Sequence, residues 1–129
     1  MKHIFSRFSM LVGEKALDKL KNSNIIIFGI GGVGSYAVES FARSGIGSMT
    51  IVDYDEISES NINRQLHALH STVGMSKGEI MKQRILDINP ECNVKLRKEL
   101  AFKNIDTFFE DNDEKYDFAV DAIDVIYSK

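Results

Sequence analysis

Three glycines, Gly29, Gly31 and Gly34, form the pattern G-x-G-x-x-G in this chain of 129 residues. The apolar run 25–28 before them is typical of a buried parallel strand, and residues 35–43 after them are predicted to be helical. In this context one glycine allows a tight turn, another lets the backbone approach phosphates, and a third lets the helix pack on the strand. The N-terminus of the helix also supplies free N–H groups for an anion. We therefore expect a nucleotide-binding loop; the alternative is that the glycines only permit close packing.

Asp53 ends a second predicted strand, 49–52, roughly 20 residues after the loop, where an acid meets the ribose hydroxyls of a bound nucleotide. Both ATP and a dinucleotide such as NAD fit a glycine loop followed by such an acid. These residues alone therefore leave open an NAD-binding half of an oxidoreductase.

Two cationic residues downstream favour ATP over NAD. Arg64 lies in a long irregular segment, 54–75, and Lys77 is the first residue of a predicted helix that opens with a capping box. A triphosphate needs more positive charge than the bridging phosphates of a dinucleotide, and both Arg and Lys bind phosphate oxygens. Asn61 and Gln65 can donate hydrogen bonds to phosphate or ribose oxygens. Taken singly, several of these residues are equally typical of surface charges and turns.

Asp121 follows a further predicted strand, 118–120, and should face the same crevice, because ligands of such sheets bind at the carboxyl ends of the strands. A carboxylate beside a polyphosphate suits a ligand of Mg²⁺, directly or through water. The alternative is that Asp121 caps a following helix.

Strands and helices alternate along the chain after an N-terminal helical stretch, 5–21, which Gly13 could divide in two. The predicted strands are 25–28, 49–52, 94–100 and 118–120, and the helices between them are 35–43, 77–88 and 104–110. This order predicts an α/β, Rossmann-like, doubly wound and mainly parallel sheet. Because nothing is left to cover the fourth strand, we expect one half of a larger protein or a truncated one. Residues 1–22 would then be an N-terminal helical segment and 23–129 the nucleotide-binding core.

Composition excludes several other classes of protein. The formal charge is −3, from 16 basic and 19 acidic side chains, without the basic excess of a self-sufficient nucleic-acid binder. The single cysteine, Cys92, rules out a disulfide framework and is expected to be a buried or turn thiol. There is no apolar stretch of membrane-spanning length and no signal peptide, so we expect a cytoplasmic protein.

Two further groups of side chains are interpreted as structural. His67 and His70 are spaced one helical turn apart but have no third metal ligand in view. Four methionines are expected to fill the core, namely Met10, Met49, Met75 and Met81.

The ordered motifs resemble the ThiF/MoeB/HesA superfamily of ubiquitin-activating-like, ATP-dependent adenylating enzymes. The residues that carry this resemblance are 29–35 (GIGGVGS), 53–55 (DYD), 60–65 (SNINRQ), 73–77 (VGMSK) and 121–124 (DAID). Residues 63–69 (NRQLHAL) and 88–92 (INPEC) look closer still to one branch, the tRNA threonylcarbamoyladenosine dehydratases.

This resemblance implies adenylation of a carboxylate by ATP with Mg²⁺. In the dehydratase branch the carboxylate is the threonyl group of a modified adenosine next to the tRNA anticodon, which then cyclises with net loss of water. In a second branch it is the C-terminal glycine of a ubiquitin-like sulfur carrier. Enzymes of the superfamily are about twice as long as this chain, so the C-terminal half would be absent here. A non-catalytic fragment is a further alternative.

The resemblance also implies roles for individual residues. Gly32 would contact the nucleotide through its backbone, and Asp53 would bind the ribose. The phosphates would be bound by Asn61, Arg64 and Lys77, with Mg²⁺ positioned by Asp121. Members of the superfamily form homodimers in which an N-terminal arginine reaches the neighbour's ATP, and Arg7 is the candidate for that arginine here.

Overall fold

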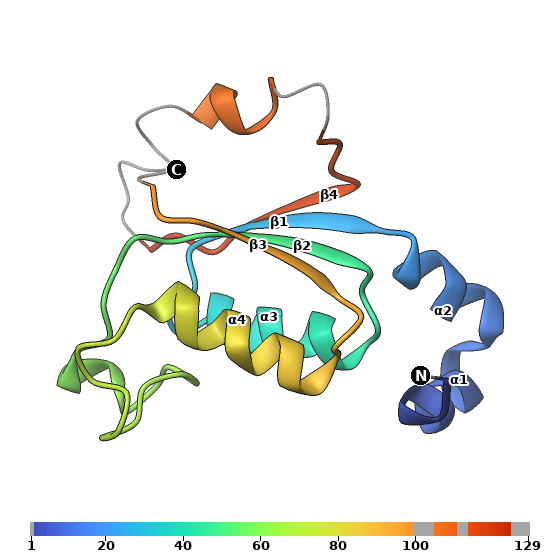
Figure 1. Ribbon diagram of the computed structural model, residues 1–129, viewed down its shortest axis with the longest axis horizontal. Helices are drawn as coiled ribbons and strands as arrows, with labels where there is room; N and C mark the ends of the chain where they lie inside the picture. Colours follow the sequence, from blue (N-terminus) through green and yellow to red (C-terminus); the bar gives the residue numbers. More distant parts are fainter. Residues whose placement is uncertain (1, 100–104, 111–113, 125–129) are drawn as a thin grey trace.

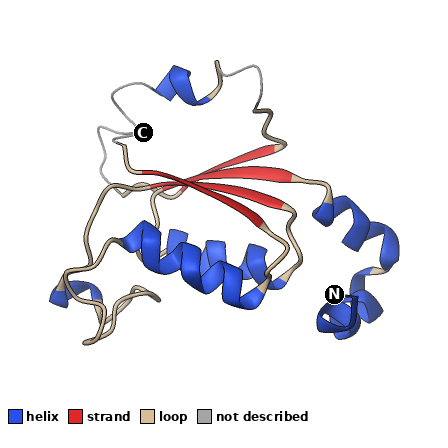
Figure 2. Ribbon diagram, viewed as in Figure 1, coloured by secondary structure: helices blue, strands red, loops and turns tan. Residues whose placement is uncertain are grey.

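A computed structural model of the chain describes residues 2–99, 105–110 and 114–124. These residues form a four-stranded sheet in the order β3-β2-β1-β4, with every neighbouring pair parallel (Figures 1 and 2). The strands are β1 (Asn24–Phe28), β2 (Ser48–Val52), β3 (Asn93–Arg97) and β4 (Phe118–Asp121). The Rossmann-like prediction is therefore confirmed, with the reversal of strand order between β1 and β4.

The two long helices cover the same face of the sheet. They are α3 (Gly34–Arg43) and α4 (Lys77–Ile88), which lie below the strands in Figure 1. Ile25 and Ile27 of β1 are at most 1% exposed and belong to the core cluster that these helices complete. Alternation of strand residues between the two faces explains why β1 has to be apolar at consecutive positions.

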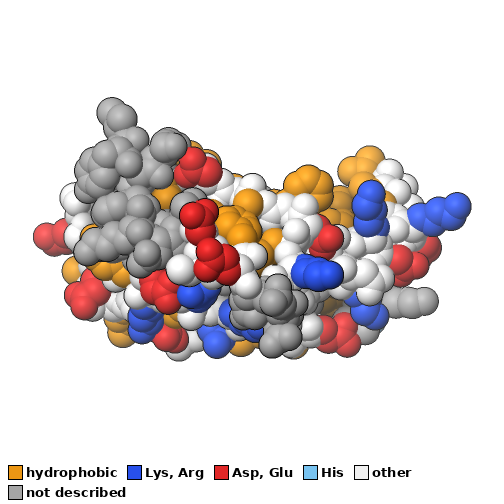
Figure 3. Space-filling model, turned by 90° about the horizontal axis from the view of Figure 1, so that it is seen from above, with side chains coloured by type: hydrophobic (Ala, Val, Ile, Leu, Met, Phe, Trp, Pro, Cys, Tyr) orange, Lys and Arg blue, Asp and Glu red, His pale blue; other side chains and the backbone are white. Residues whose placement is uncertain are grey.

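A smaller core lies on the opposite face. There Ile26 and Phe28 of β1 pack with Phe108, whose ring meets that of Phe28 edge-to-face at a centroid distance of 5.3 Å. Phe108 ends η4 (Ile105–Phe108), a single 3₁₀ turn where a longer helix was predicted. Apolar and acidic side chains are both exposed on the side of the molecule seen in Figure 3.

The N-terminal segment forms η1 (Lys2–Phe5), α1 (Ser6–Val12) and α2 (Glu14–Lys21). Gly13, with φ of 88°, separates α1 from α2, as the alternative of two short helices predicted. Neither helix contains a fully buried residue, and Met10 and Leu11 are 86% and 82% exposed. The helix at α1 is thus as predicted, whereas the spacing of its apolar side chains does not indicate that they are buried.

The methionine prediction is correct for two of four positions. Met49 of β2 and Met81 of α4 are buried, whereas Met10 and Met75 (49% exposed) lie on the surface, so for them the prediction is wrong. Cys92 is buried as expected, and burial raises the pKa of its thiol to about 11. At neutral pH this thiol stays protonated and is a poor nucleophile.

No helix among residues 2–99, 105–110 and 114–124 combines the length and the hydropathy needed to cross a bilayer.

An ion-pair network ties α3 to α4. The Glu39 carboxylate accepts hydrogen bonds from Arg84 of α4 (Nη2 to Oε2, 3.0 Å) and from Arg43 of its own helix (Nε to Oε2, 3.1 Å). The bond from Arg84 is the main reason that the pKa of Glu39 lies below its usual value near 4.5. A carboxylate with a depressed pKa stabilises the fold above the unfolded-state pKa, and this contribution is lost as pH falls through the folded-state value.

We therefore expect Glu39→Gln to lower the free energy of unfolding at pH 7 by about 1 kcal/mol or less, because pairs with this much solvent contact are weak. The difference from wild type should shrink as pH falls from the ordinary value near 4.5 toward the lower pKa of the native carboxylate, where Glu39 gains its proton in the folded protein. Urea unfolding at pH 7 and pH 3.5 measures both values. The control is Glu79→Gln, which removes an exposed pair with Lys98. An equal difference at the two pH values would contradict the role given to Glu39.

Candidate functional site

The four loop glycines divide into two pairs according to the space around them. A Cβ on Gly34 would lie 1.9 Å from the Gly29 carbonyl oxygen, and a Cβ on Gly29, where φ is 88°, would lie 3.0 Å from the Ala122 oxygen. At these two positions only glycine fits the packing of α3 and β4 on the end of β1. A Cβ on Gly31 or Gly32 would make only ordinary van der Waals contacts, at 3.5 Å and beyond. Packing thus explains why positions 29 and 34 are glycines. It does not explain Gly31 and Gly32, where the absence of a side chain leaves room for a ligand.

The glycine loop offers a row of unpaired amides at the start of α3. Ile30 N–H donates to Asp53, and Ser35 N–H donates to the Gly31 carbonyl. The amides between them, those of residues 31–34, have no acceptor in the described part of the chain. Because these N–H groups lie at the N-terminus of a ten-residue helix, they favour an anion.

Asp53 connects the end of β2 to this loop. Its Oδ2 accepts the Ile30 N–H at 2.9 Å and its Oδ1 accepts the Asp55 N–H at 2.8 Å. Each carboxylate oxygen can accept a second hydrogen bond. Asp53 is therefore able to anchor the loop and still bind a ribose hydroxyl.

The predicted irregular segment between β2 and α4 is an ordered crossover, seen at the lower left of Figure 1. Its two ends are joined by backbone bonds from Ile57 N–H to the Met75 oxygen (2.8 Å) and from Lys77 N–H to the Asp55 oxygen (3.1 Å). Within it, η2 (Glu59–Asn61) carries the buried Asn61, whose Oδ1 accepts the Ser58 N–H at 2.8 Å. That bond assigns the Asn61 oxygen to the loop and leaves its NH₂ group as the donor for a ligand.

Arg64 and Gln65 lie against the glycine loop. The nearest atoms to a Cβ on Gly32 would be Arg64 Cγ and Cδ, at 3.7 and 3.9 Å, and the nearest to one on Gly31 would be Gln65 Nε2, at 3.5 Å. Arg64 Nη1 donates to the Ser60 oxygen and to Asn63 Oδ1, both at 2.9 Å. A guanidinium has five N–H donors in all, so the remainder of the fork can reach an anion on the loop.

Lys77 places a buried positive charge beside the same loop. Its side chain is only 8% exposed, and Nζ lies 3.9 Å from Asp55 Oδ2, which is longer than a hydrogen bond. The charge of Lys77 also lowers the pKa of His67, which touches the loop at Ile30, although burial contributes more to that shift. A buried ammonium with so distant a partner is costly unless an anion joins it. The structure thus places Arg64 against the loop and Lys77 beside Asp55, whose N–H is bound by the same Asp53 carboxylate that accepts the Ile30 N–H.

Two further carboxylates, Asp53 and Asp124, act on Asp55, the partner of this ammonium. Burial raises the pKa of Asp55, the negative charges of Asp53 and Asp124 raise it further, and Lys77 opposes them. Asp121, the predicted metal ligand, is exposed at the end of β4, and its Oδ1 accepts the Ile123 N–H at 3.1 Å. This turn carries the chain on to Asp124. Asp124 was not predicted as a site residue, although it belongs to the same DAID motif as Asp121. The signal that could have found Asp124 is its position past the strand end rather than on it.

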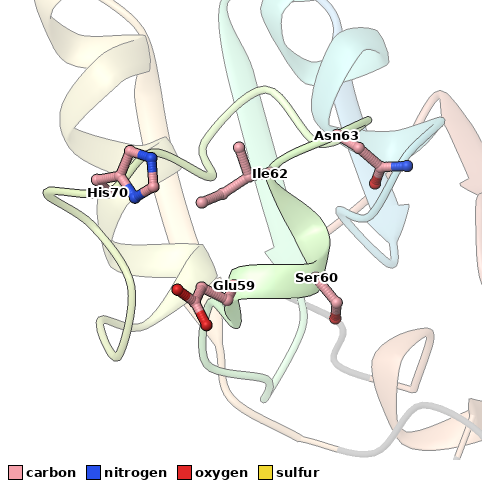
Figure 4. A pocket seen from close by; sticks show the side chains of 5 residues that line it. All are labelled: Glu59, Ser60, Ile62, Asn63 and His70. Atoms are coloured by element: carbon pink, nitrogen blue, oxygen red, sulfur yellow. The ribbon is translucent and has the colours of Figure 1, made fainter.

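His67 and His70 lie in different environments. His67 is buried against the glycine loop, whereas His70 lines a shallow hollow on the outside of the crossover, together with Glu59, Ser60, Ile62 and Asn63 (Figure 4). Within the described ranges, no three His, Cys, Asp or Glu side chains form a metal cage. Arg7 is on the surface of α1, so the structure of one chain leaves its predicted contact with a neighbouring subunit untested.

The family model described as the ThiF family matches residues 5–129. The chain belongs to the ThiF family. It is 47% identical, over its whole length, to half of the tRNA threonylcarbamoyladenosine dehydratase of Bacillus subtilis. The crystal structure of the Escherichia coli tRNA N6-threonylcarbamoyladenosine dehydratase, TcdA, in complex with ATP superposes with a TM-score of 0.90 at 40% identity, over 97% of this chain and 51% of that one.

The chain is also similar to a protein of a different name. The adenylyltransferase and sulfurtransferase MOCS3 of Drosophila yakuba is 39% identical over 90 residues, which is 70% of this chain and 20% of that protein. The chain thus spans about half the length of the bacterial dehydratases it matches and a smaller part of longer relatives.

Proposed function

We propose that this ThiF-family protein binds ATP with Mg²⁺ at the glycine loop and uses it to adenylate a carboxylate. The proposed carboxylate is the threonyl group of threonylcarbamoyladenosine in tRNA, which then cyclises with net loss of water. The observation that carries the proposal is the buried Lys77 ammonium, 3.9 Å from its partner Asp55, together with a glycine loop in which the amides of residues 31–34 have no acceptor among the described residues. The dehydratases of similar sequence, one of them in complex with ATP, support the choice of substrate.

The proposed reaction joins two anions, and the chain's own residues explain how they could meet. A carboxylate oxygen attacks the α-phosphorus of ATP, and the bond to the leaving pyrophosphate breaks. Lys77 and Arg64 would neutralise the phosphates, and the free amides of residues 31–34 would orient them. Positioning and charge stabilisation of this kind are the main sources of catalysis in phosphoryl and nucleotidyl transfer.

The carboxylates beside Lys77 fit the donor chemistry of Mg²⁺, which takes oxygen ligands, commonly one or two carboxylates with the phosphates of a substrate. Mutual repulsion contributes to the raised pKa of Asp55, so a divalent cation would relieve it. We propose Asp124 as a ligand together with the predicted Asp121. The cation would add positive charge to the phosphates.

The same proposal extends to assembly and surroundings. Residues 23–129 would form the nucleotide-binding core, and a homodimer would bring Arg7 to the ATP of its neighbour. We also propose a cytoplasmic location, because the proposed substrate is a tRNA.

A second candidate is activation of the C-terminal glycine of a ubiquitin-like sulfur carrier, which the likeness to the Drosophila protein favours. NAD binding is less well supported, because a dinucleotide has no need of both Lys77 and Arg64. Release of pyrophosphate from ATP in the full-length protein, measured with modified tRNA and with the carrier protein in turn, separates the two acceptors.

The proposal predicts that Arg64→Ala weakens Mg-ATP binding by about 1.5–3 kcal/mol, roughly 10- to 150-fold, which is the scale of a charged hydrogen bond. The measurements are calorimetry with Mg-ATP and exchange of labelled pyrophosphate into ATP, both in the full-length protein. Arg43→Ala is the control, because Arg43 lies at the far end of α3 from the loop. Unchanged ATP affinity and exchange in the Arg64 variant would count against adenylation at this site.

A further inference from the structure

His67 is a buried titratable residue with no part in the chemistry described above. Only 2% of it is exposed, and its Nε2 lies 2.7 Å from the carbonyl oxygen of Ile30 in the glycine loop. A carbonyl oxygen can only accept, so Nε2 carries the proton of this bond. Nδ1 is also buried and has no partner among the described residues. Burial, assisted by the charge of Lys77, lowers the pKa of His67, so the ring is neutral and protonated on Nε2.

Ile30 is therefore bound on both sides of its backbone. Its N–H donates to Asp53 Oδ2 at 2.9 Å, and its carbonyl accepts from His67. The peptide bond between Ile30 and Gly31 is trans, and in a trans peptide the carbonyl and the following N–H point in opposite directions. With its carbonyl directed at His67, this peptide must direct the Gly31 N–H away from the imidazole. Gly31 N–H is the first of the four unpaired amides.

This restraint matters because the loop could easily adopt another conformation. Glycines lie on both sides of Ile30, and glycine allows the backbone rotations that would turn this peptide over. The backbone at His67 is itself braced, since Thr72 Oγ1 donates to the His67 carbonyl oxygen at 2.6 Å. A firm contact thus runs from the crossover to the peptide that begins the row of amides.

Resting on the proposed ATP site, we propose that His67 is a positioning residue that fixes the Ile30–Gly31 peptide so that the Gly31 N–H faces the phosphates. It touches neither substrate nor metal. His67 in this way couples the crossover, which carries Arg64 and leads into Lys77 at the start of α4, to the orientation of the glycine loop. The coupling affects how tightly the polyphosphate of the nucleotide binds, and it does not affect binding of the nucleoside.

The experiment compares His67→Gln with His67→Met in the full-length protein. A glutamine amide can still donate to the Ile30 oxygen, whereas methionine fills similar space without a donor. We expect His67→Met to weaken Mg-ATP binding by at least about tenfold, because it leaves a buried carbonyl unpaired and the peptide free to turn, and His67→Gln to stay within about threefold of wild type. Adenosine affinity should be the same in all three proteins. In the exchange reaction the loss should appear in KM for ATP, with kcat nearly unchanged.

Several outcomes would overturn the inference. These are unchanged ATP affinity in His67→Met, equal losses in both variants, or equal losses for ATP and adenosine, which would indicate a general disruption of the fold. A wild-type protein that binds no Mg-ATP would instead overturn the proposed function. If the methionine variant fails to fold, nitrogen-15 NMR of the wild-type histidines decides. The expected result is a neutral ring protonated on Nε2 with and without ATP, and a proton on Nδ1 would contradict the inference.

Discussion

Replacing Lys77 with methionine should reduce pyrophosphate exchange by at least 100-fold while leaving the protein as stable as the wild type or more so. The loss of activity follows because removing one preorganised donor to a developing charge in a buried site costs about 10²–10³ in rate. The Lys77 side chain is 8% exposed, so solvent cannot replace the missing ammonium. Exchange of labelled pyrophosphate into ATP by the full-length protein measures this effect.

The stability of the same variant distinguishes a functional lysine from a structural one. A buried charge that is incompletely paired opposes folding, and an apolar chain of similar size removes that cost. Asp55, whose pKa is already raised mainly by burial, would then lose the one nearby charge that lowers it and become easier to protonate. The control is Lys19→Met, on α2 at the opposite end of β1 from the loop. A large drop in melting temperature for the Lys77 variant would mean that Lys77 serves the fold rather than the nucleotide.

The fold could be predicted because its signals are local. Ile25, Ile26 and Ile27 form a short apolar run of β-branched residues that fits only a strand covered on both faces, and both faces are covered. Gly13 interrupted a helical pattern and does separate two helices. The same local pattern could not show that Met10 and Leu11 are exposed, because burial depends on what packs against a helix and not on the spacing along it.

The site could be predicted only in part. Motif spacing correctly predicted that Arg64 lies against the glycine loop and that Lys77 lies near the end of β2, beside Asp55, because the order of elements in a parallel sheet determines which strand ends meet. Asp124 was not selected because a turn after the strand carries it toward Asp55, which strand periodicity does not describe. The role of His67 depends on a single hydrogen bond to Ile30, 37 positions earlier in the chain, and no spacing rule anticipates it.

Gly34→Ala should reduce the stability of the protein, whereas Gly31→Ala should reduce its affinity for ATP. At Gly34 the new methyl group would lie 1.9 Å from a backbone oxygen that cannot move without shifting β1 or α3. We expect a loss of about 3 kcal/mol in the free energy of unfolding, or roughly 10 °C in melting temperature, since overpacking against backbone is at the upper end of such costs. Thermal and urea unfolding of the two variants measure this loss.

At Gly31 the added methyl group would meet only Gln65 atoms at 3.5 and 3.8 Å, which is ordinary contact, so the fold should keep its stability. The methyl group would instead hold the phosphates away from the amides, and a small displacement of this kind can cost roughly 10- to 100-fold. Calorimetry should therefore show a stable Gly31→Ala protein with weakened Mg-ATP binding. If both variants lose stability alike, or if the Gly31 variant binds ATP as tightly as wild type, then the glycines serve packing alone and the loop is not where the phosphates bind.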